Sequence, residues 1–141
     1  MSVRWSEVRV GDVLPDMTVE VTATIVVSTA IATRDFMPVH HDRDYANQQG
    51  APDIFMNILS DTGFCSRFLT DWAGPDAFVT KLAIRLGVPV FPGATLVYAG
   101  SVAAVSRGEG GRVNEGYVDV TFRATTGLGE HLTGTATISL G

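Results

Sequence analysis

One segment of this 141-residue chain predicts a long helix with an apolar face that has to be buried. After Asp53, residues suited to a buried stripe recur at three- and four-residue steps, the spacing of one helix face. The stripe consists of Ile54, Phe55, Ile58, Leu59, Thr62, Cys65, Phe68, Leu69 and Trp72. Gly74 and Pro75 follow, as expected just past a last helical turn. The pattern predicts about 18–20 helical residues, roughly 30 Å in length, which other elements have to wrap.

The rest of the chain supplies strands for that purpose. Five segments are rich in β-branched residues or alternate between apolar and polar positions, namely 18–27, 78–86, 95–105, 113–124 and 132–140. Gly or Pro stands in the connections, including an expected hairpin loop over 108–112. A short helix over Thr29 to Arg34, capped by Ser28, is expected after the first strand. These elements predict an α+β fold, a single domain over residues 1–141 with about five mostly antiparallel strands around one long central helix.

Composition argues against several classes of function. Hydrophobic residues make up 45% of the chain, and the net charge is −5 without any run of Lys or Arg, which argues against a nucleic-acid partner. No apolar run approaches the roughly 18 residues of a membrane span, and the first residues lack the apolar core of a signal peptide. The single cysteine, Cys65, excludes an intrachain disulfide, fits a reducing cytoplasm, and is expected on a buried helix face.

The segment from Arg34 to Asp42 carries the strongest candidate for chemistry. Asp35 and His40 lie five positions apart across a bend that contains Pro38. Proline has a fixed φ and restrains the residue before it to extended geometry, so the loop is stiff. A stiff loop that carries a carboxylate and an imidazole is suited to moving a proton to or from a bound water. The structural alternative is a helix-capping acid and a loop histidine bonded to backbone.

The polar residues beside this pair are expected to be structural. His41 alternates with His40 and should point away from it in an extended segment. Asp42 and Asp44 are expected to cap a short turn over 44–49. No metal site is predicted from these side chains, because adjacent histidines do not readily converge on one ion and no other Cys or His has ligand spacing.

Three polar residues lie outside the loop. Asn57 and Asp61 are one turn apart among apolar helix residues, and we expect them to form a polar stripe facing solvent or a partner subunit. The alternative is that they line a pocket and contact water or substrate. His131 lies in a distant hairpin and is expected at the surface.

Three motifs occur in order along the chain. They are the opening segment Val10–Pro15, the Asp35-x4-His40 pair just before the long helix, and the strand-turn-strand segment Arg85–Leu96. Together they resemble the MaoC-like (R)-specific enoyl-CoA hydratases, and the resemblance covers nearly the whole chain. It implies the hotdog fold and hydration of a 2-enoyl-CoA thioester by Asp35 and His40. It implies no cofactor, since coenzyme A is part of the substrate.

Further segments resemble the small subunits of actinobacterial steroid side-chain enoyl-CoA hydratases, namely 33–36, 39–44, 53–55, 70–75 and 85–89. This resemblance implies that the substrate is an unsaturated steroid with a short CoA-thioester side chain, such as a pregnadiene-carboxyl-CoA. It implies a second, larger MaoC-like subunit without the catalytic pair, in an α2β2 heterotetramer. That subunit is expected to associate in turn with a downstream thiolase-like aldolase. The activity is expected in the cytoplasm, with neither nucleic acid nor membrane as a partner.

One position departs from the family pattern. Typical members carry His-Gly at the start of the long helix, where the glycine N–H helps to hold the thioester oxygen, whereas this chain has Met56-Asn57. The backbone N–H is present with either residue, so the resemblance assigns the oxyanion contact to the backbone of Asn57. The resemblance also implies that Arg85 lies at a subunit interface or near the coenzyme A phosphates.

Three alternatives stay open at this point. A hotdog acyl-CoA thioesterase is disfavoured by the Asp-x4-His motif, which such enzymes usually lack at this position. A non-catalytic subunit that only shapes the acyl-CoA site of a partner has no need of Asp35 and His40. A homodimer active on short straight-chain substrates is the alternative to the heteromer.

Overall fold

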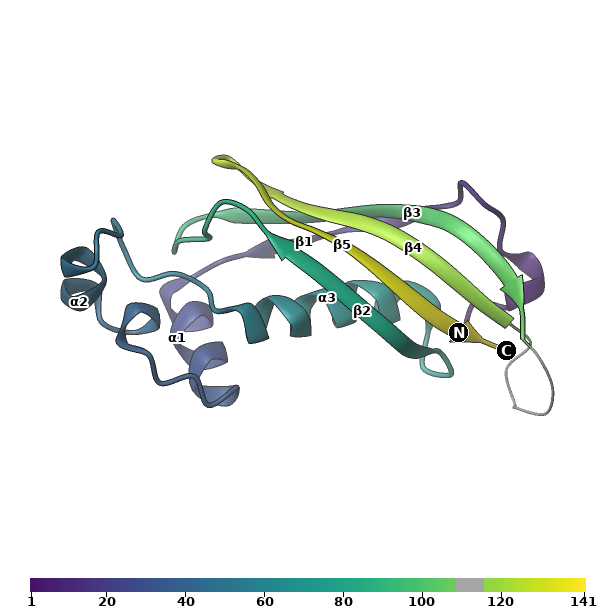
Figure 1. Ribbon diagram of the computed structural model, residues 1–141, viewed down its shortest axis with the longest axis horizontal. Helices are drawn as coiled ribbons and strands as arrows, with labels where there is room; N and C mark the ends of the chain where they lie inside the picture. Colours follow the sequence, from purple (N-terminus) through teal and green to yellow (C-terminus); the bar gives the residue numbers. More distant parts are fainter. Residues whose placement is uncertain (109–115) are drawn as a thin grey trace.

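A five-stranded antiparallel sheet with one long helix along its face forms the body of the molecule (Figure 1). The computed structural model describes residues 1–108 and 116–141. The strands are β1 (Val13–Glu20), β2 (Phe78–Leu86), β3 (Thr95–Arg107), β4 (Gly116–Thr126) and β5 (Gly129–Leu140), in the order β1-β3-β4-β5-β2. The helices are α1 (Ala23–Ala32), α2 (Arg43–Gln48) and α3 (Ile58–Ala73), with 3₁₀ turns η1 (Trp5–Glu7) and η2 (Pro38–His40). The predicted α+β arrangement is confirmed.

Helix α3 packs one face against the sheet. Its buried residues include Cys65 and Phe68, which belong to the predicted stripe. The Phe68 ring centroid lies 5.8 Å from that of Tyr98 on β3 and 5.9 Å from that of Phe122 on β4. Burial, together with the nearby Asp61 carboxylate, raises the pKa of the Cys65 thiol to about 12, so this cysteine is a neutral core residue as predicted.

The long helix begins at Ile58, later than its pattern predicts, and ends as predicted at Gly74, whose φ of 91° favours glycine. Asn57 is the N-cap, and its side chain accepts a hydrogen bond from the N–H three residues on at 3.2 Å. The residues before it do not continue the helix, because the Met56 N–H donates to the Val90 carbonyl at 3.0 Å. A contact with another segment therefore sets the start of the helix.

The segment 18–27, predicted as one strand, is divided between β1 and α1. The side chain of Thr22 caps α1, so the prediction of a later helix capped by Ser28 is wrong. β-Branched residues favour strands. As a helix, however, the segment places Val26 and Ala30 on one face, and both are fully buried. Tertiary burial overrides local propensity here.

Strands β2 to β5 confirm the four later predicted segments within a few residues. Residues 113–115, and the predicted hairpin loop from residue 109 onward, lie outside the described residues. In the part of the chain that the structure describes, no helix combines the length and apolar character needed to cross a membrane.

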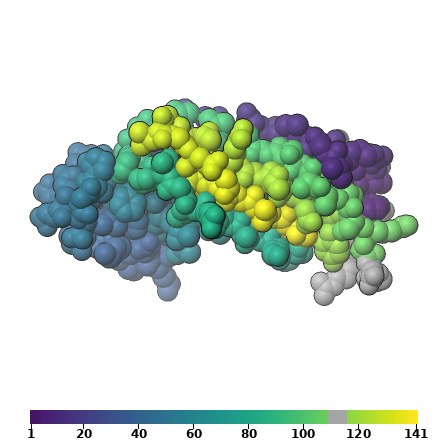
Figure 2. All heavy atoms as spheres, turned by 45° about the horizontal axis from the view of Figure 1, so that its top comes forward, coloured from purple at the N-terminus to yellow at the C-terminus, as the bar shows by residue number. Residues whose placement is uncertain are grey.

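Four elements gather at one end of the sheet: α1, η2, α2 and the start of α3 (Figure 1). In the space-filling view, the segment between α1 and α3 forms a lobe that extends beyond the strands, opposite the chain termini (Figure 2). The candidate functional residues lie where this lobe meets α3.

Candidate active site

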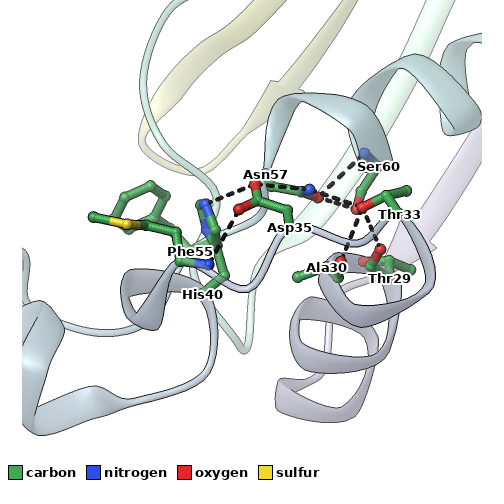
Figure 3. Close-up of polar contacts among 9 residues, drawn as sticks. Thr29, Ala30, Thr33, Asp35, His40, Phe55, Asn57 and Ser60 are labelled. Carbon is green, nitrogen blue, oxygen red and sulfur yellow. Dashed lines mark hydrogen bonds and ion pairs between the residues drawn. The ribbon is translucent and has the colours of Figure 1, made fainter.

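Asp35 and His40 lie side by side in the structure (Figure 3). The His40 Nε2 atom is 3.3 Å from Oδ2 of Asp35. On the other side of the ring, Nδ1 lies 2.7 Å from the Phe55 carbonyl oxygen, which can only accept a hydrogen bond. Nδ1 therefore carries a proton, and Nε2 is the ring nitrogen that faces the carboxylate. Asp35 Oδ2 and His40 Nε2 thus converge on one place.

The end of α1 sets the position of Asp35. Its N–H donates to the Ala30 carbonyl at 2.9 Å, and the N–H of Arg34 donates to Ile31 at 2.9 Å, the two bonds of a helix-ending Schellman motif. This motif requires a left-handed residue, and Arg34 has a φ of 57° although it is not glycine. The Met37 N–H then donates to Oδ1 of Asp35 at 3.2 Å, which orients the carboxylate.

Hydrogen bonds keep Asp35 ionised. Burial alone raises the pKa of Asp35, but the Asn57 side-chain amide, the Met37 N–H and the charge of His40 outweigh burial, so the net pKa is below its ordinary value. The Asp35 side chain is 27% exposed and that of His40 is 10% exposed. The carboxylate thus remains open to a water or a substrate.

The side chain of Asn57 makes contacts that the sequence did not predict. Its Nδ2 donates to Asp35 Oδ2 at 3.1 Å and to Thr33 Oγ1 at 2.9 Å, while its Oδ1 accepts from the N–H and hydroxyl of Ser60 (Figure 3). All four hydrogen-bonding positions of the amide are used. The expectation that Asn57 faces solvent or a partner is wrong, since it is 2% exposed. It links the Asp35 carboxylate to the first turn of α3.

The backbone of Asn57 remains suited to the predicted oxyanion contact. Its N–H has no hydrogen-bond acceptor within residues 1–108 and 116–141. It stands directly at the N-terminus of α3, where the helix dipole favours negative charge. The oxyanion role stays a prediction.

The other polar residues near the loop have structural places. His41 is exposed, and Asp42 is the N-cap of α2, accepting from the Tyr45 N–H at 3.1 Å as predicted. Asp44 is exposed in the first turn of α2 rather than capping it. The described residues contain no group of three or more His, Cys, Asp or Glu side chains that could hold a metal ion. Arg85 is exposed on β2.

Two predictions fail at a second acid–imidazole pair. Asp61 is fully buried rather than solvent-facing, and His131 is 2% exposed rather than at the surface. Asp61 Oδ1 lies 2.7 Å from His131 Nε2. The spacing from Asp61 to Cys65 and Phe68 already places the acid on the buried face, and a buried carboxylate requires a partner. That reasoning could have predicted a partner for Asp61, although not which one.

We expect Asn57→Ala to shift the pH dependence of the reaction. The variant removes a donor that lowers the pKa of Asp35, so this pKa rises and the acid limb of the kcat/KM profile moves to higher pH. Loss of one hydrogen bond to a charged group is expected to lower kcat/KM roughly 10-fold. The profile between pH 4 and 9 is to be measured beside Asn57→Ser, which retains an oxygen able to cap α3. A profile of Asn57→Ala that matches the wild type would exclude the side chain from positioning Asp35.

The fold and this pair define a class of protein, the hotdog hydratases. No protein-family model matches the chain. It is 46% identical over 131 residues to the 3-oxo-4,17-pregnadiene-20-carboxyl-CoA hydratase beta subunit of Mycobacterium tuberculosis, covering 93% of this chain and 95% of that protein. The chain belongs to the MaoC-like enoyl-CoA hydratase family.

Solved structures agree with this assignment. A chain in the crystal structure of the ChsH1-ChsH2 complex from Mycobacterium tuberculosis is 45% identical, with a TM-score of 0.85 over 94% of this chain and 98% of that one. The R-hydratase PhaJ1 from Pseudomonas aeruginosa has a TM-score of 0.84 at 20% identity, over 99% of this chain and 86% of that one. The second similarity supports the fold alone, which is the predicted hotdog fold.

Proposed function

We propose that this chain is the catalytic subunit of an enoyl-CoA hydratase that acts on an unsaturated steroid with a short CoA-thioester side chain, such as a pregnadiene-carboxyl-CoA. The observation that carries the proposal is the convergence of Asp35 Oδ2 and His40 Nε2 beside the start of α3. The steroid substrate is supported by the name of the relative that is 46% identical over 131 residues.

The proposed reaction adds water across the 2,3 double bond of the thioester. A water donates hydrogen bonds to Asp35 and His40, and its oxygen attacks C3 as one of the two groups accepts its proton. The electron pair of the double bond moves toward the thioester oxygen, where the N–H of Asn57 stabilises the developing enolate. A proton is then returned to C2 from the same pair. The net change is one water added, with the thioester bond intact.

An apolar surface around the pair supports a large substrate and a second subunit. Five large apolar side chains are between 49% and 65% exposed on α1, on the loop from Asp35 to His40 and on the first turn of α3. They are Ile31, Phe36, Met37, Ile58 and Leu59. Two of them, Ile58 and Leu59, belong to the stripe that the sequence predicted to be buried. Large apolar side chains exposed on neighbouring elements are typical of ligand or protein contacts. In the proposed complex, the steroid and the partner subunit cover them.

The sheet edges differ in how well they are protected. β1 carries Pro15, a residue that hinders pairing with another strand. Both edge strands have a register shift, between Leu14 and Met17 in β1 and between Val79 and Lys81 in β2. β2 contains no proline and has Phe78 and Leu86 exposed at its ends. We therefore assign the β2 edge to the second MaoC-like subunit, in an assembly with two copies of each chain. Association with a downstream thiolase-like aldolase through that subunit, and a cytoplasmic location, belong to the same proposal.

The test is an absorbance assay of the conjugated thioester with steroid and straight-chain 2-enoyl-CoAs. A hydratase removes the conjugated band without releasing a free thiol, and we expect the steroid thioester to be preferred. A thiol reagent in the same cuvette detects thioesterase activity directly. Release of coenzyme A at the rate at which the band disappears would overturn the proposal.

A further inference from the structure

A second acid–imidazole pair lies in the interior, apart from the catalytic residues. His131 Nδ1 is 2.6 Å from the Val88 carbonyl oxygen, so that nitrogen donates its proton there. Nε2 therefore faces Asp61 Oδ1, 2.7 Å away, and one shared proton holds the two together. The side chains are 3% and 0% exposed. The pair thus joins α3, β5 and the segment after β2.

Stability alone does not account for this pair. Removing two charged or polar groups from water is costly, and well-packed apolar residues commonly stabilise a fold as well as a buried pair does. In addition, the second oxygen of Asp61, Oδ2, has no hydrogen-bond partner among the described residues. Such an incompletely satisfied buried group calls for another reason for its presence.

The pair is connected to His40 through one peptide unit. His131 holds the carbonyl of Val88, and two residues later the carbonyl of Val90 accepts from the Met56 N–H at 3.0 Å. That N–H belongs to the same peptide unit as the Phe55 carbonyl, which accepts from His40 Nδ1 at 2.7 Å. The peptide that fixes the His40 tautomer is therefore held on its other side by the segment that His131 binds.

The same pair is connected to Asp35 through α3. The Asp61 N–H donates to the Asn57 carbonyl at 3.2 Å in the first turn of the helix, and the Asn57 amide donates to Asp35. Asp61 is thus linked through α3 to Asn57, which contacts Asp35. His131 is linked through residues 88–90 to the 55–56 peptide, which contacts His40.

We propose that Asp61 and His131 form a positioning pair for the hydration reaction, which holds the 55–56 peptide so that His40 keeps one tautomer and its Nε2 faces the water shared with Asp35. The proposal rests on the hydratase function proposed above. Neither residue contacts the substrate, so the pair acts on turnover rather than on substrate affinity.

The test replaces the pair without leaving a lone buried charge. In the complex with its partner subunit, Asp61→Leu/His131→Leu is expected to fold and to lower kcat roughly 10–100-fold, since small misplacements of catalytic groups have effects of this size. KM is expected to change less than threefold. Asp61→Asn, whose amide can donate to Nε2 of the neutral ring, is expected to retain kcat within threefold. Ile138→Val, a core change on β5 outside this network, controls for general loosening of the fold.

A readout without substrate separates this proposal from the proposed function. With ¹⁵N-labelled histidine rings in the same complex, His40 is expected to show the Nδ1–H tautomer in the wild type and a mixture of tautomers in the double variant. If the double variant does not fold, His131→Gln removes the contact to Val88 and is expected to give the same two changes. Unchanged kcat with an unchanged His40 tautomer would overturn the positioning role. If the wild-type complex does not hydrate the thioester but the double variant still changes the His40 tautomer, the proposed function is overturned and the structural link from the pair to His40 remains.

Discussion

Asp35→Asn and His40→Ala are each expected to lower kcat for hydration by roughly 10²–10⁴-fold, the usual contribution of a general acid–base group. These variants remove or alter Oδ2 and Nε2, the two atoms proposed to bind the reacting water. The fold is expected to survive, because Asp35 is partly exposed and His40 lies at the edge of the core. Steady-state kinetics on the purified complex, with circular dichroism as a control for folding, measures the loss.

The double variant gives a sharper result. Because the two groups act on one water, Asp35→Asn/His40→Ala is expected to lose little more activity than the worse single variant. His41→Ala is the matched control, since this neighbour is exposed to solvent and is expected to retain wild-type kcat. Near-normal turnover by either single variant, or losses that multiply in the double variant, would contradict the shared-water mechanism.

The second large effect concerns the partner subunit. The chain alone is expected to hydrate the steroid thioester about 100-fold more slowly than the complex, or slower still, because the proposed partner completes and orients the site for a four-ring acyl group. The exposed apolar residues Phe36 and Ile58 are expected to become protected from solvent in the complex. Co-expression with the proposed second MaoC-like subunit, followed by size-exclusion chromatography with light scattering, should give an assembly with two copies of each chain.

The rival assembly makes different predictions. A homodimer would pair two copies of this chain and hydrate short straight-chain substrates without help. A stable homodimer that hydrates the steroid thioester at the full rate would contradict the heteromer. The variant Leu82→Arg on β2, at a half-buried position of that edge strand, is expected to weaken the complex if β2 is the contact.

Most of the helices and strands that could be predicted from the sequence lie in long segments with a periodic apolar pattern. The pattern through Cys65 and Phe68 predicted α3, and alternating strands predicted the sheet, because both depend on burial that repeats at a fixed period. The first half of α1, residues 23–27, was predicted incorrectly as a strand, because its β-branched residues favour strands until packing against the rest of the fold is considered. The start of α3 depends on a hydrogen bond to Val90, which is distant in sequence and therefore invisible to local rules.

The candidate site was predictable only in part, for the same reason. Asp35 and His40 are close in sequence, so the loop between them sufficed to place them together. His131 reaches Asp61 across 70 positions, and no local signal connects them. Asn57 was predicted for its backbone, yet its side chain contacts Asp35 and Thr33. The contact of this side chain with Asp35 depends on where the fold places Asp35 after the end of α1, which local sequence rules do not reveal.

Hydration in ¹⁸O-labelled water tests the central claim most directly. The wild-type complex is incubated with the steroid 2-enoyl-CoA, and the product is analysed by mass spectrometry. We predict one ¹⁸O atom on C3 of an intact CoA thioester, formed roughly 10²–10⁴-fold more slowly by Asp35→Asn. Free coenzyme A with ¹⁸O in the carboxyl group of a released acid, or labelled thioester formed equally well by Asp35→Asn, would contradict the assignment of water activation to Asp35 and His40.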